Sequence, residues 1–242
     1  TSRKVLFTQS GMLLVDQART VLREVKLLKE MASNQGKEMT GPLHIGLIPT
    51  VGPYLLPYIV PTLKETFPDL EVFLYELETG RLDCAIVARV PETEAFIEVP
   101  IFDEKMLLAV SEQHPWASES KIAMNTLKGQ EMLMLDDGHC LRNQALDYCF
   151  TAGAKEDSHF QATSLETLRN MVAANVGITF MPELAVLNEG TRAGVKYIPC
   201  HSPEPSRTIA LVYRPGSPLR NRYERVASAV SEQVKSILAN KK

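Results

Sequence analysis

The 242-residue sequence contains few cysteines and no long apolar run. Four cysteines are too few for a disulfide scaffold in a chain of this length, which favours a reducing compartment. A membrane span needs roughly 20 consecutive apolar residues, and no such stretch occurs. Residues 1–11 also lack the apolar core and the cleavage site of a secretory signal. These absences predict a cytoplasmic location and no membrane contact.

Motifs for phosphates, dinucleotides and metals are missing as well. No glycine-rich loop of the P-loop or dinucleotide-binding type occurs. Cys200 precedes His201, but no second pair of ligands follows at a spacing suited to zinc. We therefore expect no cofactor and no metal.

Charge is distributed unevenly along the chain. The net charge of −3 is not typical of a nucleic-acid-binding domain. Residues 1–37 nevertheless carry seven Lys and Arg against three acidic residues, a net charge of +4, so the remainder carries −7. The sequence thus joins a basic amino-terminal segment to an acidic body.

A helix with a narrow apolar seam is predicted near the amino terminus. Thr8 or Ser10 can cap this helix, and polar residues 33–37 end it as a linker. The seam consists of apolar residues at alternating steps of four and three, namely Leu14, Ala18, Val21, Val25, Leu28 and Ala32. So narrow a seam favours dimerisation with a second copy, although packing on its own domain is the alternative.

Beyond the linker, strand patterns alternate with helix patterns. Strands are predicted at 42–48, 70–75, 82–87, 96–101, 106–110, 131–135, near Phe160, 178–181 and 209–213. Helices are predicted from about 51 to 67, at 141–150, at 165–174 with Thr163 and Glu166 as a capping box, and at 219–238. This alternation predicts an α/β fold with mostly parallel sheets.

Several segments resemble the LysR-type transcriptional regulators, and the resemblance covers the whole chain. Residues 1–11 and the helix after them are similar to the wing and linker helix of that family. Residues 80–86, GRLDCAI, resemble its G-x-L-D-x-A-I strand, and 164–182 resemble its later helix–strand signature. Residues 138–142, GHCLR, together with Cys149 resemble the peroxide-sensing branch of the family.

The resemblance implies two doubly wound α/β subdomains, similar to type 2 periplasmic binding proteins and preceded by a long linker helix. The expected parts are a wing remnant with a dimerisation helix (1–37), subdomain I (41–102 plus 207–242) and subdomain II with the redox cysteines (103–206). The family's amino-terminal helix-turn-helix is missing, so we expect a fragment. The family also places a helix and a second peroxide-contacting threonine after Glu76, where the five residues 76–80 are too few for a helix.

Cys140 and Cys149 are spaced awkwardly for a structural disulfide. In one continuous helix, nine residues correspond to a rise of about 13 Å and a rotation of about 180°. A disulfide needs Cα atoms within roughly 4.4–6.8 Å, so the pair can bond only if the helix unwinds or moves. Leu141, Ala145 and Leu146 share an apolar side with Cys149, which predicts a buried Cys149. Such a spacing suits a redox switch, in which disulfide formation requires a conformational change.

Cys140 has neighbours that suit a reactive thiol. It follows a turn at 136–138 and is expected at a helix amino terminus, where free N–H groups favour the thiolate. His139 and Arg142 are close in sequence and can add positive charge or hydrogen-bond donors, which Asp136 and Asp137 would oppose if they face the sulfur. From the residues alone, two inert cysteines remain the alternative.

The resemblance implies that Cys140 is the peroxide-reactive thiol and that Cys149 is the resolving thiol. It also implies that Thr50, His139 and Arg207 bind hydrogen peroxide beside Cys140. From the residues alone, Thr50 could instead cap the helix that follows it, and Arg207 could be a solvated residue at the start of a strand. His139 could be a turn residue bonded to backbone.

The implied function is a hydrogen peroxide-sensing transcriptional activator of the oxidative stress response, not an enzyme, switched by a Cys140–Cys149 disulfide. Its expected partners are hydrogen peroxide, DNA through the missing helix-turn-helix, RNA polymerase and further copies of the chain in a homotetramer. The alternative is a LysR-type regulator that senses a small organic effector between the subdomains. Two further functions fit the sequence less well. A solute-binding protein would need neither the apolar seam nor the cysteine pair. A thiol peroxidase would need a docking partner that regenerates the thiol, and the sequence shows no sign of one.

Overall fold

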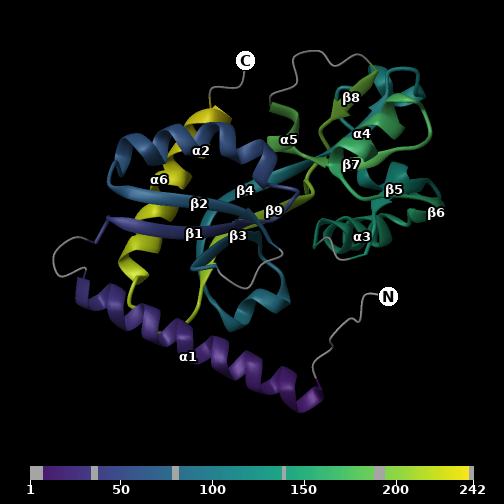
Figure 1. The fold of residues 1–242 in the computed structure, drawn as a ribbon. Helices are drawn as coiled ribbons and strands as arrows, with labels where there is room; N and C mark the ends of the chain where they lie inside the picture. Colours follow the sequence, from purple (N-terminus) through teal and green to yellow (C-terminus); the bar gives the residue numbers. More distant parts are fainter. Residues whose placement is uncertain (1–7, 34–37, 78–81, 138–139, 188–193, 240–242) are drawn as a thin grey trace, which may run out of the picture.

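The computed structural model describes residues 8–33, 38–77, 82–137, 140–187 and 194–239 (Figure 1). A long amino-terminal helix, α1 (Gln9–Ser33), runs outside a two-part α/β body. The body has the following elements in chain order: β1 (Gly41–Leu47), α2 (Gly52–Thr66), β2 (Leu70–Glu76), β3 (Cys84–Ala88), η1 (Pro91–Ala95), β4 (Ile97–Ser111), η2 (Pro115–Ser118), η3 (Met124–Leu127), β5 (Glu131–Leu135), α3 (Cys140–Ala152), β6 (Lys155–Ala162), α4 (Leu165–Ala173), β7 (Thr179–Pro182), α5 (Glu183–Leu187), β8 (Val195–Ile198), β9 (Ser206–Tyr213) and α6 (Arg220–Ala239). The predicted α/β class is confirmed.

The sheets are mixed, so the prediction of mostly parallel sheets is wrong. Strands β1 and β2, β1 and β3, and β5 and β6 pair in parallel. Strand β9 pairs antiparallel with both β3 and β4, and β4 pairs antiparallel with β7 and β8. An alternation of strands and helices implies parallel pairing only when each strand joins its neighbour through a crossover. Here β9 returns late in the chain and inserts between β3 and β4.

Strand β4 is one long strand where the sequence predicted two, at 96–101 and 106–110. The polar residues 103–105 interrupt the apolar pattern, but β9 pairs with β4 across them. The first part of β4 lies in the sheet of β9 and β3, and its second part pairs with β7 and β8. The strands β4 and β9 therefore connect the two parts of the body (Figure 1).

Buried apolar side chains form two clusters, which we use to name the two halves of the body. The first half surrounds a cluster contributed mainly by β1, α2, β3, β9 and α6, with Leu43, Ile59, Ile86, Leu211 and Val226 among its members. The second half surrounds a cluster contributed mainly by β4, β5, α3, α4 and β7, with Leu108, Leu133, Cys149, Val172 and Phe180 among its members. Leu184, from the segment expected in subdomain II, packs in the first cluster.

The apolar seam of α1 does not pack on the body. The Thr8 hydroxyl accepts a hydrogen bond from the backbone N–H of Gly11 at 3.1 Å, which confirms the predicted cap. Every residue of the predicted seam is exposed, including Leu14 at 71% and Leu28 at 66%. Packing of the seam on its own domain is therefore wrong, and dimerisation stays a prediction.

Helix α4 begins one residue later than the predicted capping box implies. Its cap is Ser164, whose hydroxyl accepts a hydrogen bond from the N–H of Thr167 at 3.2 Å. Glu166 instead accepts a hydrogen bond from the hydroxyl of Tyr54 in α2, at 3.1 Å. The predicted Thr163–Glu166 box is wrong because Glu166 is drawn toward the first half.

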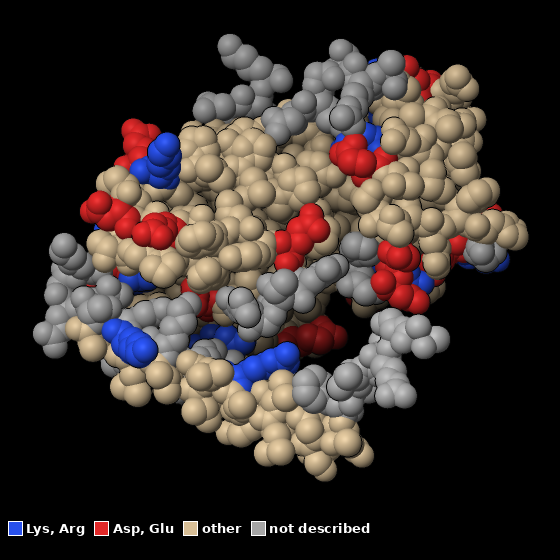
Figure 2. All heavy atoms as spheres, in the orientation of Figure 1, with Lys and Arg blue, Asp and Glu red and all other residues tan. Residues whose placement is uncertain are grey.

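The visible face of the body carries scattered charges of both signs rather than one basic patch (Figure 2). Among the residues that the structure describes, no helix is both long and apolar enough to cross a bilayer.

Candidate redox site

Helix α3 presents two different faces. Cys140 is its first residue, as the sequence predicts, and the helix continues unbroken to Ala152. The side facing the second cluster buries Leu141, Ala145, Leu146 and Cys149, which confirms the predicted burial of Cys149. Cys140 itself is half-buried and packs against the first cluster. The two thiols therefore belong to different cores.

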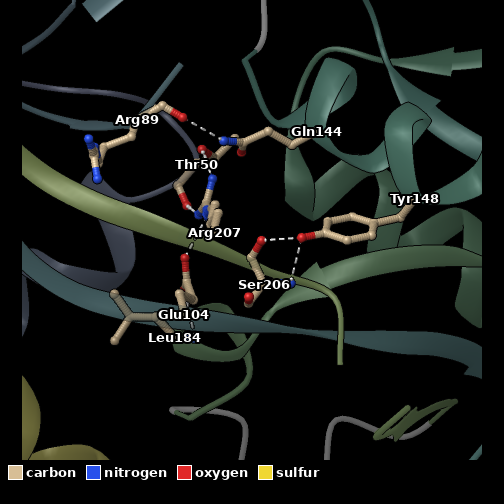
Figure 3. Close-up of polar contacts among 8 residues, drawn as sticks. All are labelled: Thr50, Arg89, Glu104, Gln144, Tyr148, Leu184, Ser206 and Arg207. Carbon is tan, nitrogen blue, oxygen red and sulfur yellow. Dashed lines mark hydrogen bonds and ion pairs between the residues drawn. The ribbon is translucent and has the colours of Figure 1, made fainter. Parts of the chain in front are cut away.

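The opposite face of α3 is polar and reaches across to other elements (Figure 3). Gln144 Nε2 donates a hydrogen bond to the carbonyl oxygen of Arg89, just after β3, at 3.2 Å. The Tyr148 hydroxyl donates to the carbonyl oxygen of Ser206 at 2.6 Å and accepts from the N–H of the same residue at 3.1 Å. Because Gln144 and Tyr148 follow Cys140 at steps of four, the three side chains share one side of the helix.

A buried arginine lies at the crossing between the halves. The guanidinium of Arg207 donates from Nε to Glu104 at 2.7 Å, from Nη1 to the Thr50 hydroxyl at 3.0 Å and from Nη2 to the Thr50 carbonyl at 3.1 Å (Figure 3). The side chains of Arg207 and Glu104 are 0% and 1% exposed. The second carboxylate oxygen of Glu104 accepts the backbone N–H of Leu184 at 3.0 Å. The guanidinium is thus fixed on three sides.

These contacts settle two alternatives that the residues left open. Arg207 is not a solvated residue at a strand start, because its side chain is completely buried. Thr50 does not cap α2, because Val51 occupies the cap position and no side chain makes a cap hydrogen bond there. Thr50 and Arg207, which are 157 residues apart in sequence, are brought into direct contact.

The thiol of Cys140 experiences opposing influences. Burial raises the pKa of Cys140 above its ordinary value, and this influence is the largest. The positive charge of Arg207 and hydrogen bonds from backbone groups at Leu141, Cys140 and Ala88 lower the same pKa, but only in part. The predicted stabilisation of the thiolate by N–H groups at the start of the helix is present, but burial against an apolar core outweighs it, so the pKa of Cys140 lies above its ordinary value.

Arg142 does not supply the positive charge that the sequence assigned to it. Its Nη2 donates to both carboxylate oxygens of Glu156 at 2.9 Å, and its Nη1 lies 3.4 Å from Asp137. A guanidinium paired with two carboxylates leaves little net field for a neighbouring sulfur. The charge that acts on Cys140 comes from Arg207, which is remote in sequence.

Cys149 is held as a neutral thiol. Its side chain is 0% exposed, and its Sγ–H donates to the Met132 sulfur at 3.1 Å. Burial, with the negative charge of Glu156, raises the pKa of Cys149 to about 12. The thiols of Cys140 and Cys149 are both free, and the continuous helix between them places them on opposite sides.

A cavity of about 400 Å³ opens beside the polar face of α3. Its lining residues are Arg89, Gln144, Asp147, Tyr148, Thr151, Ser206, Arg207 and Thr208. The predicted site residue His139 and the segment 78–81 lie outside the described residues. Within the described ranges, no group of three His, Cys, Asp or Glu side chains is placed to hold a metal ion.

Glu104 is a site residue that the sequence analysis missed. It lies in β4 between Phe102 and Met106, and all three are buried, whereas Asp103 and Lys105 between them are exposed. A carboxylate on the buried face of an alternating strand is unusual unless it is paired. The alternation along this strand was the sequence signal that could have identified Glu104, although it does not identify Arg207 as the partner of Glu104.

Comparison with known proteins assigns the fold to a class. Residues 36–235 match the family model described as the LysR substrate binding domain. The chain therefore belongs to the LysR family, and the expected fold of two periplasmic-binding-protein-like subdomains is confirmed.

Particular relatives lie within the peroxide-sensing branch. A hydrogen peroxide-inducible genes activator from Haemophilus influenzae is 90% identical over 247 residues, which cover 98% of this chain and 82% of the relative. The DNA-binding transcriptional dual regulator OxyR from Escherichia coli is 67% identical and covers 95% of this chain and 78% of the relative. The aligned span with the first relative exceeds the 242 residues of this chain, so that relative has residues without a counterpart here.

Solved structures agree with this assignment. The crystal structure of the oxidized form of OxyR has a TM-score of 0.75 and 60% identity, covering 82% of this chain and 98% of that chain. The reduced form of OxyR has the same TM-score and 57% identity, with the same coverage. The predicted resemblance to the peroxide-sensing branch of the LysR family is confirmed.

Proposed function

We propose that this chain is the regulatory part of a hydrogen peroxide-sensing transcriptional activator that responds to oxidative stress. The names of its relatives support this function, and the existence of oxidized and reduced OxyR structures supports a redox switch. The observation that carries the proposal is the position of Cys140. It lies at the start of α3 within the field of the buried Arg207, while Cys149 is buried in the other core.

In the first step, the Cys140 thiolate attacks one oxygen of hydrogen peroxide. An S–O bond forms, the O–O bond breaks, the sulfur is oxidised to a sulfenic acid, and hydroxide leaves and takes up a proton to become water. Arg207 stabilises the thiolate and the leaving hydroxide by its charge. The Thr50 hydroxyl, oriented by Arg207, is available as donor and acceptor to the peroxide.

In the second step, unwinding of α3 exposes Cys149, its thiol gives up a proton, and the resulting thiolate attacks the Cys140 sulfur. An S–S bond forms, the S–O bond breaks, and hydroxide leaves and is protonated to water. This step requires α3 to unwind, because the helix holds the two residues nearly 180° apart by its geometry. The reshaped segment 140–150 then changes how subunits pack, which repositions the DNA-binding domains.

The remaining assignments are part of the same proposal. The chain divides into a wing remnant with a dimerisation helix (1–37), subdomain I (41–102 plus 207–242) and subdomain II (103–206). The protein acts in the cytoplasm as a homotetramer, contacts DNA through an amino-terminal helix-turn-helix, works with RNA polymerase and is not an enzyme. The exposed seam of α1 supports a partner helix.

A LysR-type regulator that senses a small organic effector is the second candidate. The cavity beside α3 favours it, because about 400 Å³ lined by polar side chains has room for such a molecule. That function predicts a response that does not depend on Cys140.

Thiol mapping by mass spectrometry tests the proposal directly. After brief treatment with low peroxide, wild-type protein is expected to contain a Cys140–Cys149 disulfide, and Cys149→Ser to stop at an oxidised Cys140. Cys140→Ser is expected to leave Cys149 reduced, and Cys200→Ala, another buried cysteine, serves as the matched control. Wild-type protein that shows no oxidation at Cys140 would exclude the thiol mechanism.

A further inference from the structure

The polar face of α3 is fastened at two points that the peroxide chemistry does not use. Gln144 holds the carbonyl oxygen of Arg89, and Tyr148 holds both backbone polar groups of Ser206. We call these two side chains, with their backbone partners, the α3 latch (Figure 3).

The latch joins α3 to the first half and to the start of a strand that connects the two halves. Arg89 follows β3 in the first half, and Ser206 is the first residue of β9, directly before Arg207. The Tyr148 hydroxyl uses its donor and its acceptor on one backbone unit, which fixes the ring in both distance and direction. The latch therefore holds α3 in register with the strand that carries the arginine of the thiol site.

The latch contacts and the Cys140–Cys149 disulfide cannot exist in the same conformation. Both latch residues lie between Cys140 and Cys149 in the sequence, within the segment that has to lose its helical geometry before the two sulfurs meet. Unwinding moves Gln144 and Tyr148 away from partners whose positions are set by β3 and β9. Attack of peroxide on Cys140 needs no such movement, because Cys140 is half-buried at the helix start.

We propose that Gln144 and Tyr148 are positioning residues that latch α3 and set the rate of the second step of the switch. With the latch closed, Cys140 is oxidised to the sulfenic acid, and the disulfide forms only in molecules whose latch has opened. This inference rests on the proposed function, since it assumes that Cys140 is oxidised and Cys149 resolves it. It identifies the residues that delay disulfide formation after Cys140 has been oxidised.

The test is Tyr148→Phe, which keeps the ring and removes only the hydroxyl. Losing both hydrogen bonds of the hydroxyl to Ser206 raises the open fraction, so we expect the disulfide to form about tenfold faster. Gln144→Asn keeps an amide but shortens the side chain, and about a threefold acceleration is expected from the loss of one bond. The rate of sulfenic acid formation is expected to match wild type in both.

The measurement is rapid mixing with peroxide followed by quenching. A sulfenate-specific trapping reagent reports the first step, and mass spectrometry of the Cys140–Cys149 peptide reports the second. Tyr54→Phe is the matched control, because its hydroxyl also bonds between the halves, to Glu166, but not from α3. It is expected to leave the disulfide rate unchanged. Amide hydrogen exchange gives a second readout, with faster exchange expected in α3 of Tyr148→Phe and unchanged exchange in α2.

The outcomes separate the two proposals. Absence of Cys140 oxidation in wild-type protein overturns the proposed function itself. Normal sulfenic acid formation with an unchanged disulfide rate in Tyr148→Phe and Gln144→Asn overturns the latch alone. Equal acceleration in Tyr54→Phe also overturns the latch, because it would show general loosening of the two halves.

Discussion

The buried pair of Glu104 and Arg207 makes a quantitative prediction about stability. The two residues lie opposite each other in the register of β4 and β9, and neither side chain is more than 1% exposed. Removing one partner of such a pair leaves an uncompensated charge in a dry site, which costs roughly 3–5 kcal/mol. Replacing both partners by apolar residues avoids that cost.

The perturbation is a double-mutant cycle of Glu104→Met, Arg207→Met and the double variant. Each single substitution is expected to lower the free energy of unfolding by about 4 kcal/mol. The double variant loses only the neutral-group contacts, namely the acceptor for the Leu184 N–H and the donors to Thr50, and is expected to cost about 2 kcal/mol. The two single effects are therefore strongly non-additive.

The assay is urea unfolding at pH 7 followed by circular dichroism. Glu104→Gln is the control, because its amide oxygen still accepts from Arg207 while the negative charge is removed. Single variants that each lose less than about 1 kcal/mol, or a double variant whose loss equals the sum of the singles, would refute the buried-pair reasoning. The Arg207→Met variant also removes a charge that lowers the pKa of Cys140, so its thiol is expected to react more slowly with peroxide at neutral pH.

Three further predictions concern other parts of the molecule. Leu28→Glu in the exposed seam of α1 is expected to leave the circular dichroism spectrum unchanged and to shift light scattering toward the monomer; an unchanged mass would exclude the seam as a dimer contact. Burial raises the pKa of Cys149 from 9.0 to about 12, so the unfolded chain loses the thiol proton at a lower pH than the folded protein does. Between pH 9 and about pH 12, the free energy of unfolding of the wild type is therefore expected to fall relative to that of Cys149→Ala. Urea titrations at pH 8 and near the upper end of that window measure this difference, and a constant difference would contradict it. Thr50→Val is expected to slow sulfenic acid formation several-fold and to lower the free energy of unfolding by about 1–3 kcal/mol, because it leaves the buried Nη1 donor of Arg207 without its acceptor, as stopped-flow and urea titration would show.

Local patterns predicted much of the architecture because they depend on short-range geometry. The steps of four and three in α1 correctly placed one apolar stripe along the helix, and the structure shows that this stripe is exposed. The spacing of Cys140 and Cys149 correctly placed them on opposite sides of one helix, since rise and rotation per residue are fixed. The same approach failed at β4, because three consecutive polar residues led to a prediction of two strands. The structure has one continuous strand there, which pairs with β9 across the polar residues.

The sequence by itself determined the α/β class, the apolar seam of α1, the burial of Cys149 and the placement of Cys140 and Cys149 on opposite sides of one helix. Only the tertiary structure decided which charge acts on Cys140. It paired Arg142 with Glu156, and it brought Arg207 to Glu104 across 103 residues and to Thr50 across 157. Periodicity encodes which side of an element is buried, but partners in a buried polar network are selected by the packing of distant strands.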